Sequence, residues 1–178
     1  MKRFLAAAGP IVLLAFATGC TLPLGMCIDE ARNLSLDGTW EATGSTETIP
    51  GSVLVGMHEA RNHNTKDTTA QEYFWSIRSS SIDRATVSAV HVHERDTDRL
   101  LFEIPIENTP GAPAEFITNS NRRPHNGAIA QWSEVYEILG SGRGYVDVHL
   151  GGSGEPVLRA NLTPQHSNWR NFVHSSCS

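Results

Sequence analysis

The stretch ATVSAVHVH, residues 85–93, alternates β-branched residues with other side chains over the length of one strand. Val and Thr favour extended backbone, and successive side chains of a strand point to opposite faces. Val90 and Val92 therefore share one face of the expected strand, and His91 and His93 share the other. The stretch predicts a half-buried strand that carries two imidazoles on one side.

A second stretch, YVDVHL at residues 145–150, has the same layout. Its two valines lie in one phase, and Tyr145, Asp147 and His149 lie in the other. If the two strands lie close together, three imidazoles converge. Neutral imidazole is the commonest metal ligand in proteins, and a site of three nitrogens suits copper or zinc. The predicted ligands are His91, His93 and His149.

A histidine on a half-exposed strand is also often solvated or bonded to a backbone carbonyl, so a site without metal is the alternative interpretation. His125, in the segment RRPHNG, is the candidate for a fourth ligand. The remaining histidines lie in polar segments, and we expect them at the surface: His58, His63, His166 and His174.

The rest of the chain is predicted to form further short strands, joined by segments rich in Gly, Pro and Asn. Alternation predicts strands at residues 34–43, 50–57, 72–79, 99–106 and 157–162, with Pro105 marking a strand end. Residues 58–69 and 108–124 are expected to be loops, with a short strand at 114–118 inside the second. These strands predict a mainly β fold, an antiparallel Greek-key sandwich or barrel.

One segment changes period. Apolar residues spaced three and four apart predict a short helix at about 128–139, ended by Gly140, before the penultimate core strand. The residues of its apolar face are Ile129, Trp132, Val135, Tyr136 and Leu139.

The chain opens with a basic and then apolar segment, MKRFLAAAGPIVLLAFATGC, typical of a bacterial export signal over residues 1–19. Residues 17–20 resemble a lipobox, in which Cys20 is lipidated and anchors the protein on the outer or periplasmic side of a membrane. Residues 15–17 offer ordinary cleavage after Ala17, which would give a secreted protein. A tether at 20–33, a β domain at 34–164 and a C-terminal tail at 165–178 are expected to follow. Trp169 and Phe172 of this tail are candidates to pack back onto the domain.

Two further cysteines, Cys27 and Cys177, lie near the two ends of the expected mature chain. In an oxidising compartment they favour a disulfide that closes nearly the whole chain into one loop. The alternative is two unrelated terminal thiols.

Composition excludes several classes of function. The net charge is −5 and no basic patch is present, which argues against nucleic-acid binding. The chain has no G-x-S-x-G motif, no phosphate-binding glycine loop and no C-x-x-C motif. Carboxylates are scattered and form no evident catalytic pair, so a non-catalytic module is favoured over an enzyme.

The order of motifs resembles the chordin-type CHRD domain over residues 34–162. The motifs are TETIP, AVHVH, LLFEIPI, a helix, GSGRGYVDVHL and a closing GEPVLRANL. The resemblance implies an antiparallel β domain of exported bacterial proteins and no defined reaction. The family's glycine-rich loop after the H-x-H strand is replaced here by ERDTDR, and the closing motif carries two extra residues.

The segments HVHERDTD and GRGYVDVH also resemble the copper-ligand strands of copper–zinc superoxide dismutases. This resemblance implies copper bound by His91, His93 and His149, with Arg159 attracting the superoxide anion. No zinc-binding loop matches, so the resemblance implies a site with copper alone.

Three functions remain open from the sequence. The first is an exported CHRD-like module of the cell envelope that binds a transition metal. The second is a superoxide dismutase-like oxidoreductase that depends on copper. The third is a purely structural domain whose sheet meets another envelope protein.

Overall fold

The computed structural model describes residues 27–106, 116–124, 130–151, 154–166 and 168–174. These segments form one antiparallel sheet curled into a half-barrel, with one short helix, which confirms the predicted mainly β class. The first strands are β1 (Cys27–Ala42), β2 (Thr48–Asn62), β3 (Thr68–Ser79), β4 (Val87–Glu94) and β5 (Leu100–Glu103), with the 3-10 turn η1 (Arg84–Thr86) before β4. Then follow β6 (Phe116–Pro124), α1 (Trp132–Gly140), β7 (Gly144–Leu150), β8 (Pro156–Asn161), β9 (Thr163–His166) and β10 (Arg170–His174).

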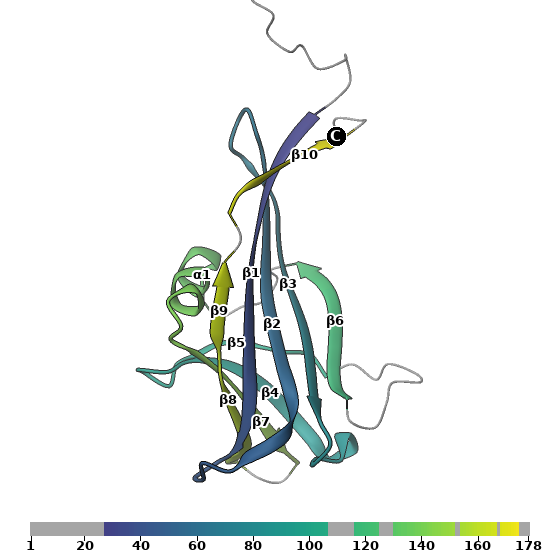
Figure 1. Cartoon of the computed structure of the whole chain (residues 1–178), viewed down its shortest axis with the longest axis vertical. Helices are drawn as coiled ribbons and strands as arrows, with labels where there is room; N and C mark the ends of the chain where they lie inside the picture. Colours follow the sequence, from purple (N-terminus) through teal and green to yellow (C-terminus); the bar gives the residue numbers. More distant parts are fainter. Residues whose placement is uncertain (1–26, 107–115, 125–129, 152–153, 167, 175–178) are drawn as a thin grey trace, which may run out of the picture.

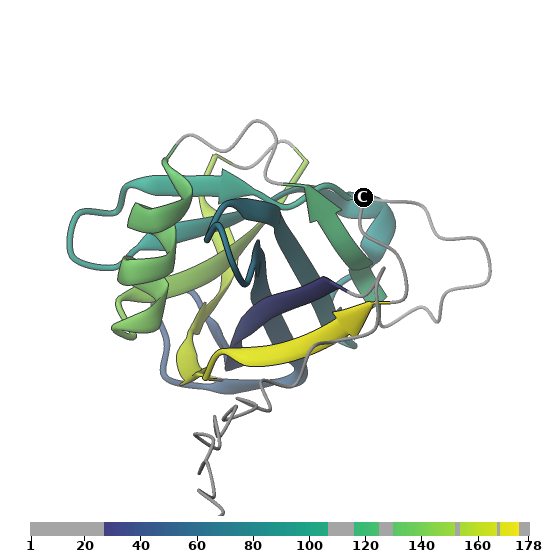
Figure 2. The same ribbon diagram turned by 90° about the horizontal axis from the view of Figure 1, so that it is seen from above.

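Strand order in the sheet is β5-β4-β7-β8-β1-β2-β3-β6, and β9 and β10 pair with further parts of β1. Three long strands, β1 to β3, stand side by side, and β4, β5, β7 and β8 gather at their lower end (Figure 1). Strand β8 returns to lie beside β1 of this three-stranded meander, which is the spatial order of a Greek key. Seen from above, the strands curl around a common interior, and α1 stands at one side (Figure 2).

Alternation along the strands fills this interior with apolar side chains. Cross-strand rows such as Leu36–Val55–Trp75 come from the long strands, and rows such as Val92–Val146–Ala160 come from the other half of the sheet. All members of both rows are at most 3% exposed. Burying a Val or Leu side chain in such a row stabilises the fold by about 1.5–3 kcal/mol.

The helix completes the core from one side. Its buried residues are Trp132, Val135, Ile138 and Leu139, whereas Tyr136 of the predicted face is only partly buried. Helix α1 begins at Trp132 and not at 128, and Ile129 lies outside the described residues. Gly142 adopts a left-handed conformation with φ of 76°, which turns the chain from α1 into β7.

A hydrogen bond joins β6, at one end of the strand order, to the segment just after β5, at the other end. Thr118 of β6 donates its hydroxyl to the carbonyl of Pro105, just after β5, at 2.8 Å. The indole Nε1 of Trp75 donates to the same Thr118 hydroxyl at 3.3 Å. This link lies where Pro105 ends the strand pairing, because proline has no N–H to donate.

The long hairpin differs from the sequence prediction. Residues 58–69 were expected to form a loop, but β2 continues to Asn62 and β3 begins at Thr68. Likewise, residues 27–33 lie in β1 although the sequence indicated a tether up to residue 33. The polar side chains that suggested loop are accommodated by ion pairs between neighbouring strands, such as Arg32 with Glu59 at 2.6 Å.

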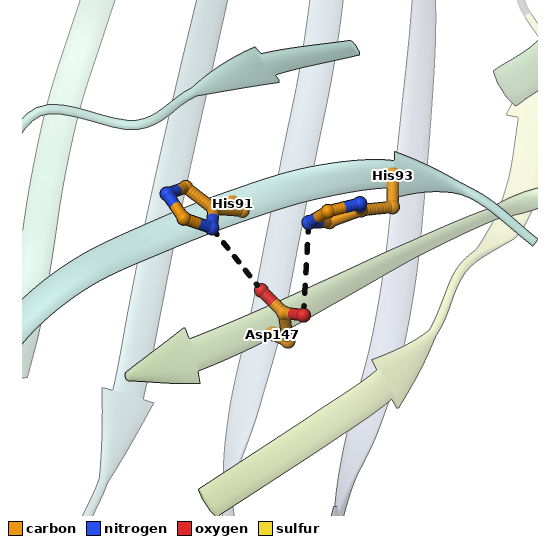
Figure 3. Close-up of side chains that lie close together, drawn as sticks. All are labelled: His91, His93 and Asp147. Atoms are coloured by element: carbon orange, nitrogen blue, oxygen red, sulfur yellow. Dashed lines mark ion pairs between the residues drawn. The ribbon is translucent and has the colours of Figure 1, made fainter. Parts of the chain in front are cut away.

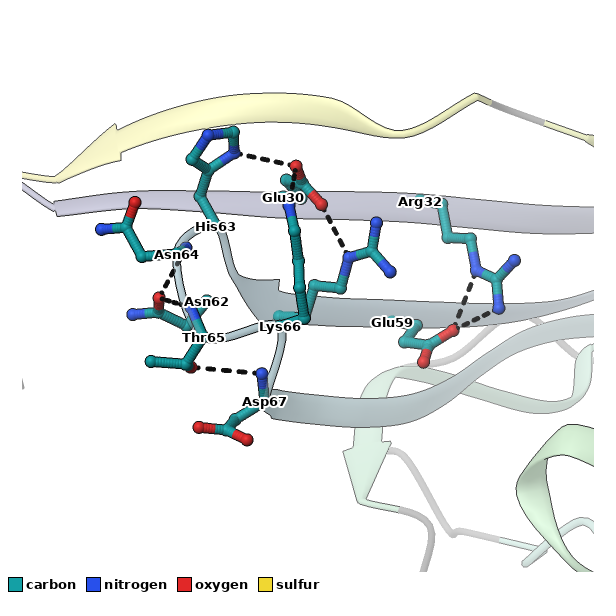
Figure 4. A network of polar contacts seen from close by, with 10 residues as sticks. Glu30, Arg32, Glu59, Asn62, His63, Asn64, Thr65, Lys66 and Asp67 are labelled. Atoms are coloured by element: carbon teal, nitrogen blue, oxygen red, sulfur yellow. Dashed lines mark hydrogen bonds and ion pairs between the residues drawn. The ribbon is translucent and has the colours of Figure 1, made fainter.

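Glu30 is the centre of a cluster of ion pairs near the tip of the hairpin (Figure 4). Its carboxylate accepts from Lys66 Nζ at 2.7 Å, from Arg61 Nε at 2.6 Å and from His63 Nδ1 at 2.8 Å. Hydrogen bonds from Lys66 and then Arg61 lower the pKa of Glu30 from 4.5 to about 2. The tip of the hairpin is therefore held by one carboxylate that three side chains share.

The C-terminal segment packs on this hairpin. The ring of Trp169 lies 3.8 Å from the guanidinium of Arg61 and 4.8 Å from that of Arg32. Arg32 in turn lies 4.1 Å from the ring of Tyr136 in α1. Strands β9 and β10 flank Trp169 and both pair with β1, so the described part of the tail belongs to the sheet. The side chain of Phe172 lies outside the described residues, although its backbone pairs with Asp29.

Replacement of Glu30 by Gln is expected to lower stability at neutral pH. The pKa of Glu30 is lower in the folded state, so its contribution is fully present above pH 4.5 and is lost as the pH falls towards 2. Thermal unfolding of the two proteins followed from pH 7 to pH 2 should show melting temperatures that converge over this window. The matched control is Glu41→Gln, on the exposed part of β1. A Glu30→Gln difference that is independent of pH would contradict the assignment.

Candidate metal centre

Strands β4 and β7 pair directly, so the two histidine-bearing stretches of the sequence are neighbours in the sheet. The register places His91 opposite Asp147, Ala89 opposite His149 and His93 opposite Tyr145. All these side chains lie on the face of the sheet that points away from the core, because the alternate positions carry the buried valines.

Three of the side chains form a compact group (Figure 3). The ligand atoms of His91, His93 and Asp147 all lie within 4.8 Å of one another. His91 Nδ1 is 3.8 Å from Asp147 Oδ1, and His93 Nε2 is 3.7 Å from Asp147 Oδ2. These distances are too long for hydrogen bonds, so the carboxylate faces two imidazoles without bonding to either.

His149 lies beside this group and contacts its carboxylate. Its Nε2 is 3.2 Å from Asp147 Oδ1, and its ring centroid is 4.8 Å from that of His91. The predicted trio of imidazoles therefore shares one face, but the tightest set of ligand atoms replaces His149 by Asp147. His149 supports the carboxylate and remains near enough to be a fourth ligand.

The carboxylate of this group is more deeply buried than the imidazoles around it. The Asp147 side chain is only 3% exposed, while the three imidazoles keep between 13% and 23% of their surface. A buried carboxylate is costly unless charge or hydrogen bonds compensate it. Burial lowers the pKa of His91, and Asp147 opposes this shift while His149 and His93 add to it. The neutral form of His91, which is the metal-binding form, is thus favoured.

His93 has a defined tautomer. Its Nδ1 lies 3.0 Å from the backbone carbonyl of Asp98, and a carbonyl only accepts hydrogen bonds. Nδ1 therefore carries a proton, and the neutral ring has its lone pair on Nε2. This Nε2 is buried and has no hydrogen-bond partner. A buried lone pair directed at a carboxylate is unfavourable unless a cation lies between the two groups.

A second layer of polar groups surrounds His93. The Tyr145 ring stacks on the imidazole with centroids 5.0 Å apart and planes 6° apart. The Tyr145 hydroxyl donates to the Asp98 carboxylate, and the guanidinium of Arg159 lies 4.1 Å from the centroid of the Tyr145 ring. Arg159 is opposite Asp147 in the pairing of β7 with β8, so the arginine predicted from the sequence is adjacent to the group.

The other predicted residues lie elsewhere or outside the described residues. His125, Cys20 and Cys177 are not among the described residues, and the side chain of Cys27 is not described, so the fourth ligand, the lipid anchor and the disulfide stay predictions. His58 was expected at the surface but is 7% exposed in β2, because its Nδ1 contacts Asn33 Oδ1 of the paired strand at 2.7 Å. His63 and His166 are at least partly exposed.

Asp147 is the residue that the sequence reasoning left out of the ligand set. The available signal was its phase, since residues 147 and 149 alternate with the apolar residues 146, 148 and 150 and therefore share a face. Only the pairing with β4 shows that Asp147, and not His149, is opposite His91.

Comparisons with known proteins add no relative. No family model, no curated protein and no solved structure matches the chain.

The His91 imidazole is expected to titrate below its ordinary pKa of 6.5 in the metal-free protein, because burial disfavours the charged ring. Protonation is then weaker in the folded than in the unfolded state, so this histidine makes the fold less stable as the pH falls below 6.5. Two-dimensional NMR of the histidine ring protons measures the pKa of His91 in the folded protein, and the same protein unfolded in urea gives the reference. A folded-state pKa of His91 at or above this reference would refute the prediction.

Proposed function

We propose that this protein is a β module that binds a divalent transition metal through His91, His93 and Asp147. The observation that carries the proposal is the buried Nε2 of His93, which has no hydrogen-bond partner and points at a buried carboxylate 3.7 Å away. A metal ion placed between them would give both groups a partner at once.

The donor atoms lie close to the spacing that a metal requires. Zinc bonds of about 2.0–2.1 Å in a tetrahedron separate ligand atoms by roughly 3.4 Å. The donor atoms of His91, His93 and Asp147 lie within 4.8 Å of one another, and each imidazole has one nitrogen 3.7 or 3.8 Å from a carboxylate oxygen. Rotation of the Asp147 carboxylate and of the His91 ring would bring these donors to the spacing of a metal site.

The donor set indicates which metals fit. Two imidazole nitrogens and one carboxylate oxygen suit zinc, copper or iron(II), and they do not suit calcium or magnesium, which take oxygen ligands. His149 is the nearest further ligand, by way of its contact with Asp147. With three ligands from the protein, the remaining position is open to water or to a partner's side chain.

The setting of this module is part of the proposal. The signal-like N-terminus and the resemblance to CHRD domains support an exported protein of the bacterial cell envelope, anchored through a lipid on Cys20 or secreted after cleavage at Ala17. Among the described residues, no helix has the length and apolar character that crossing a membrane requires. Another envelope protein would be the partner of such a module, and nucleic acid would not.

Titration with zinc or copper(II) is expected to raise the melting temperature of the chain, purified without a histidine tag. A ligand that binds only the folded state stabilises it by about 2.7 kcal/mol at a hundredfold excess over Kd. His93→Gln and Asp147→Asn should abolish the shift, because each removes one ligand atom and nearly keeps the side chain's shape.

The matched control is His166→Gln, an exposed histidine outside the group. It should leave the metal-dependent shift unchanged. No shift with either metal, or equal shifts in all four proteins, would overturn the proposal and leave the structural interaction domain as the function that remains.

A second function, superoxide dismutation by a copper-only site, is favoured by one observation. Arg159 lies opposite Asp147 on β8, at the position where a cation would draw a small anion towards the group. Copper would supply the one-electron redox chemistry when bound. The carboxylate in the ligand set and the contacts of Arg159 with Tyr145 and Asp98 speak for the binding module instead.

Superoxide consumption by the copper-loaded protein separates the two functions. The binding module predicts a thermal shift with copper and a rate of superoxide loss no higher than that of Asp147→Asn measured at the same protein and copper concentrations. A rate that exceeds this control and falls in Arg159→Gln would establish the oxidoreductase.

A further inference from the structure

Asp98, in the turn between β4 and β5, contacts the candidate metal centre. Asp98 has a φ of 57°, the left-handed conformation that Asp tolerates better than most residues. Its backbone carbonyl accepts the hydrogen bond from His93 Nδ1, and its side chain accepts the hydrogen bond from the Tyr145 hydroxyl. One residue of the turn thus contacts both rings of the stacked pair.

We propose that Asp98 and Tyr145 are positioning residues for a metal ligand. The Asp98 carbonyl fixes the tautomer of His93, and the Tyr145 hydroxyl, by binding the Asp98 carboxylate, holds this carbonyl in place. The inference rests on the proposed function and names the residues that prepare one of its ligands. We call the unit of His93, Asp98 and Tyr145 the clamp.

The clamp favours one of the two tautomers of His93. A proton on Nδ1 leaves the lone pair on Nε2, and only this nitrogen faces Asp147. The opposite tautomer would aim an N–H at the carboxylate and block a metal there. Ligands that bind through one imidazole nitrogen are commonly oriented by a hydrogen bond from the other to a backbone carbonyl.

Stacking on Tyr145 restricts movement of the His93 ring perpendicular to its own plane. The Tyr145 side chain is fully enclosed, at 1% exposure, and its ring is nearly parallel to that of His93. The guanidinium of Arg159 lies 4.1 Å from the Tyr145 centroid, so the tyrosine is held by a cation as well as by its hydroxyl. The imidazole therefore rests against a side chain that is itself fixed.

The Asp98 carboxylate contributes little to global stability, which makes the positioning role of the clamp separable. The Asp98 side chain is 74% exposed, so water replaces the lost hydrogen bond when its carboxylate is removed. Asp98→Gly keeps the left-handed backbone and the carbonyl but lacks the carboxylate. Asp98→Asn keeps an oxygen that accepts from the Tyr145 hydroxyl and is the conservative rescue. Tyr145→Phe keeps the stack and removes the hydroxyl.

The first readout is the tautomer of His93 in the metal-free protein, measured at pH 8 by ¹⁵N-correlated NMR of the imidazole rings. The wild type and Asp98→Asn are expected to hold His93 with its proton on Nδ1. Asp98→Gly and Tyr145→Phe are expected to show a mixture of both tautomers. Asp96→Gly, in the same turn, and Tyr136→Phe, on the helix, are the matched controls and should resemble the wild type.

The second readout is zinc affinity by calorimetry. Asp98→Gly and Tyr145→Phe should bind zinc about 10- to 100-fold more weakly, as is typical when a group that orients a metal ligand is removed. Asp98→Asn should lie close to the wild type. The visible spectrum of the cobalt(II)-substituted protein should change in the same two variants, which a loss of stability alone would not cause.

The outcomes separate this inference from the function on which it rests. A wild type in which His93 carries its proton on Nε2 would overturn the clamp, and so would tautomer and affinity that are unchanged in both variants. A changed tautomer with unchanged affinity would overturn it too, because the orientation would not matter to the metal. A wild type that binds no zinc or cobalt would overturn the proposed function, and the clamp as a device for a metal ligand would fall with it, even if the tautomers behave as expected.

Discussion

The register between β4 and β7 is the constraint on which the candidate centre depends. Side chains of a strand alternate between faces, so a slip of β4 by one residue would turn its valines outwards and its histidines inwards. Burial of Val92 and Val146 on the core face prevents this slip. The same pairing sets His91 against Asp147 on the opposite face, so apolar packing determines the geometry of the polar group.

Among the described residues, the buried carboxylates of Glu30 and Asp147 have surroundings that differ in kind. Glu30 accepts hydrogen bonds from Lys66, Arg61 and His63, and two of these partners are a lysine and an arginine. Asp147 faces three imidazoles, and among the described residues His149 is the one within hydrogen-bond distance of its carboxylate. The first arrangement satisfies its carboxylate and explains a structural role at the hairpin tip. The second leaves acceptor capacity unused, and this difference is why the metal proposal concerns Asp147.

Much of the fold was predictable from local pattern. Alternation located the core face of the strands, and spacing of three and four located the helix that buries Val135 and Leu139. Patterns cannot show which strands pair, because the pairing of β4 with β7 joins segments far apart in the chain. That is why the phase of His91 and His149 could be predicted while the place of Asp147 between them could not. The polar hairpin at residues 58–69 was misjudged for a related reason, since its ion pairs involve partners on another strand.

Strand β1 is bordered on one edge by β2 and on the other by β10, β9 and a short stretch of β8 in turn. The first described strand is thus completed by the last ones, and its pairs with β8, β9 and β10 join residues far apart in the sequence. Such a high contact order slows folding, because the loop must close before any of these pairs forms. While the chain is being made, one edge of β1 stays open until β10 has followed. This open edge is a template for wrong pairing between chains, so the interval before closure is when the protein most needs a chaperone.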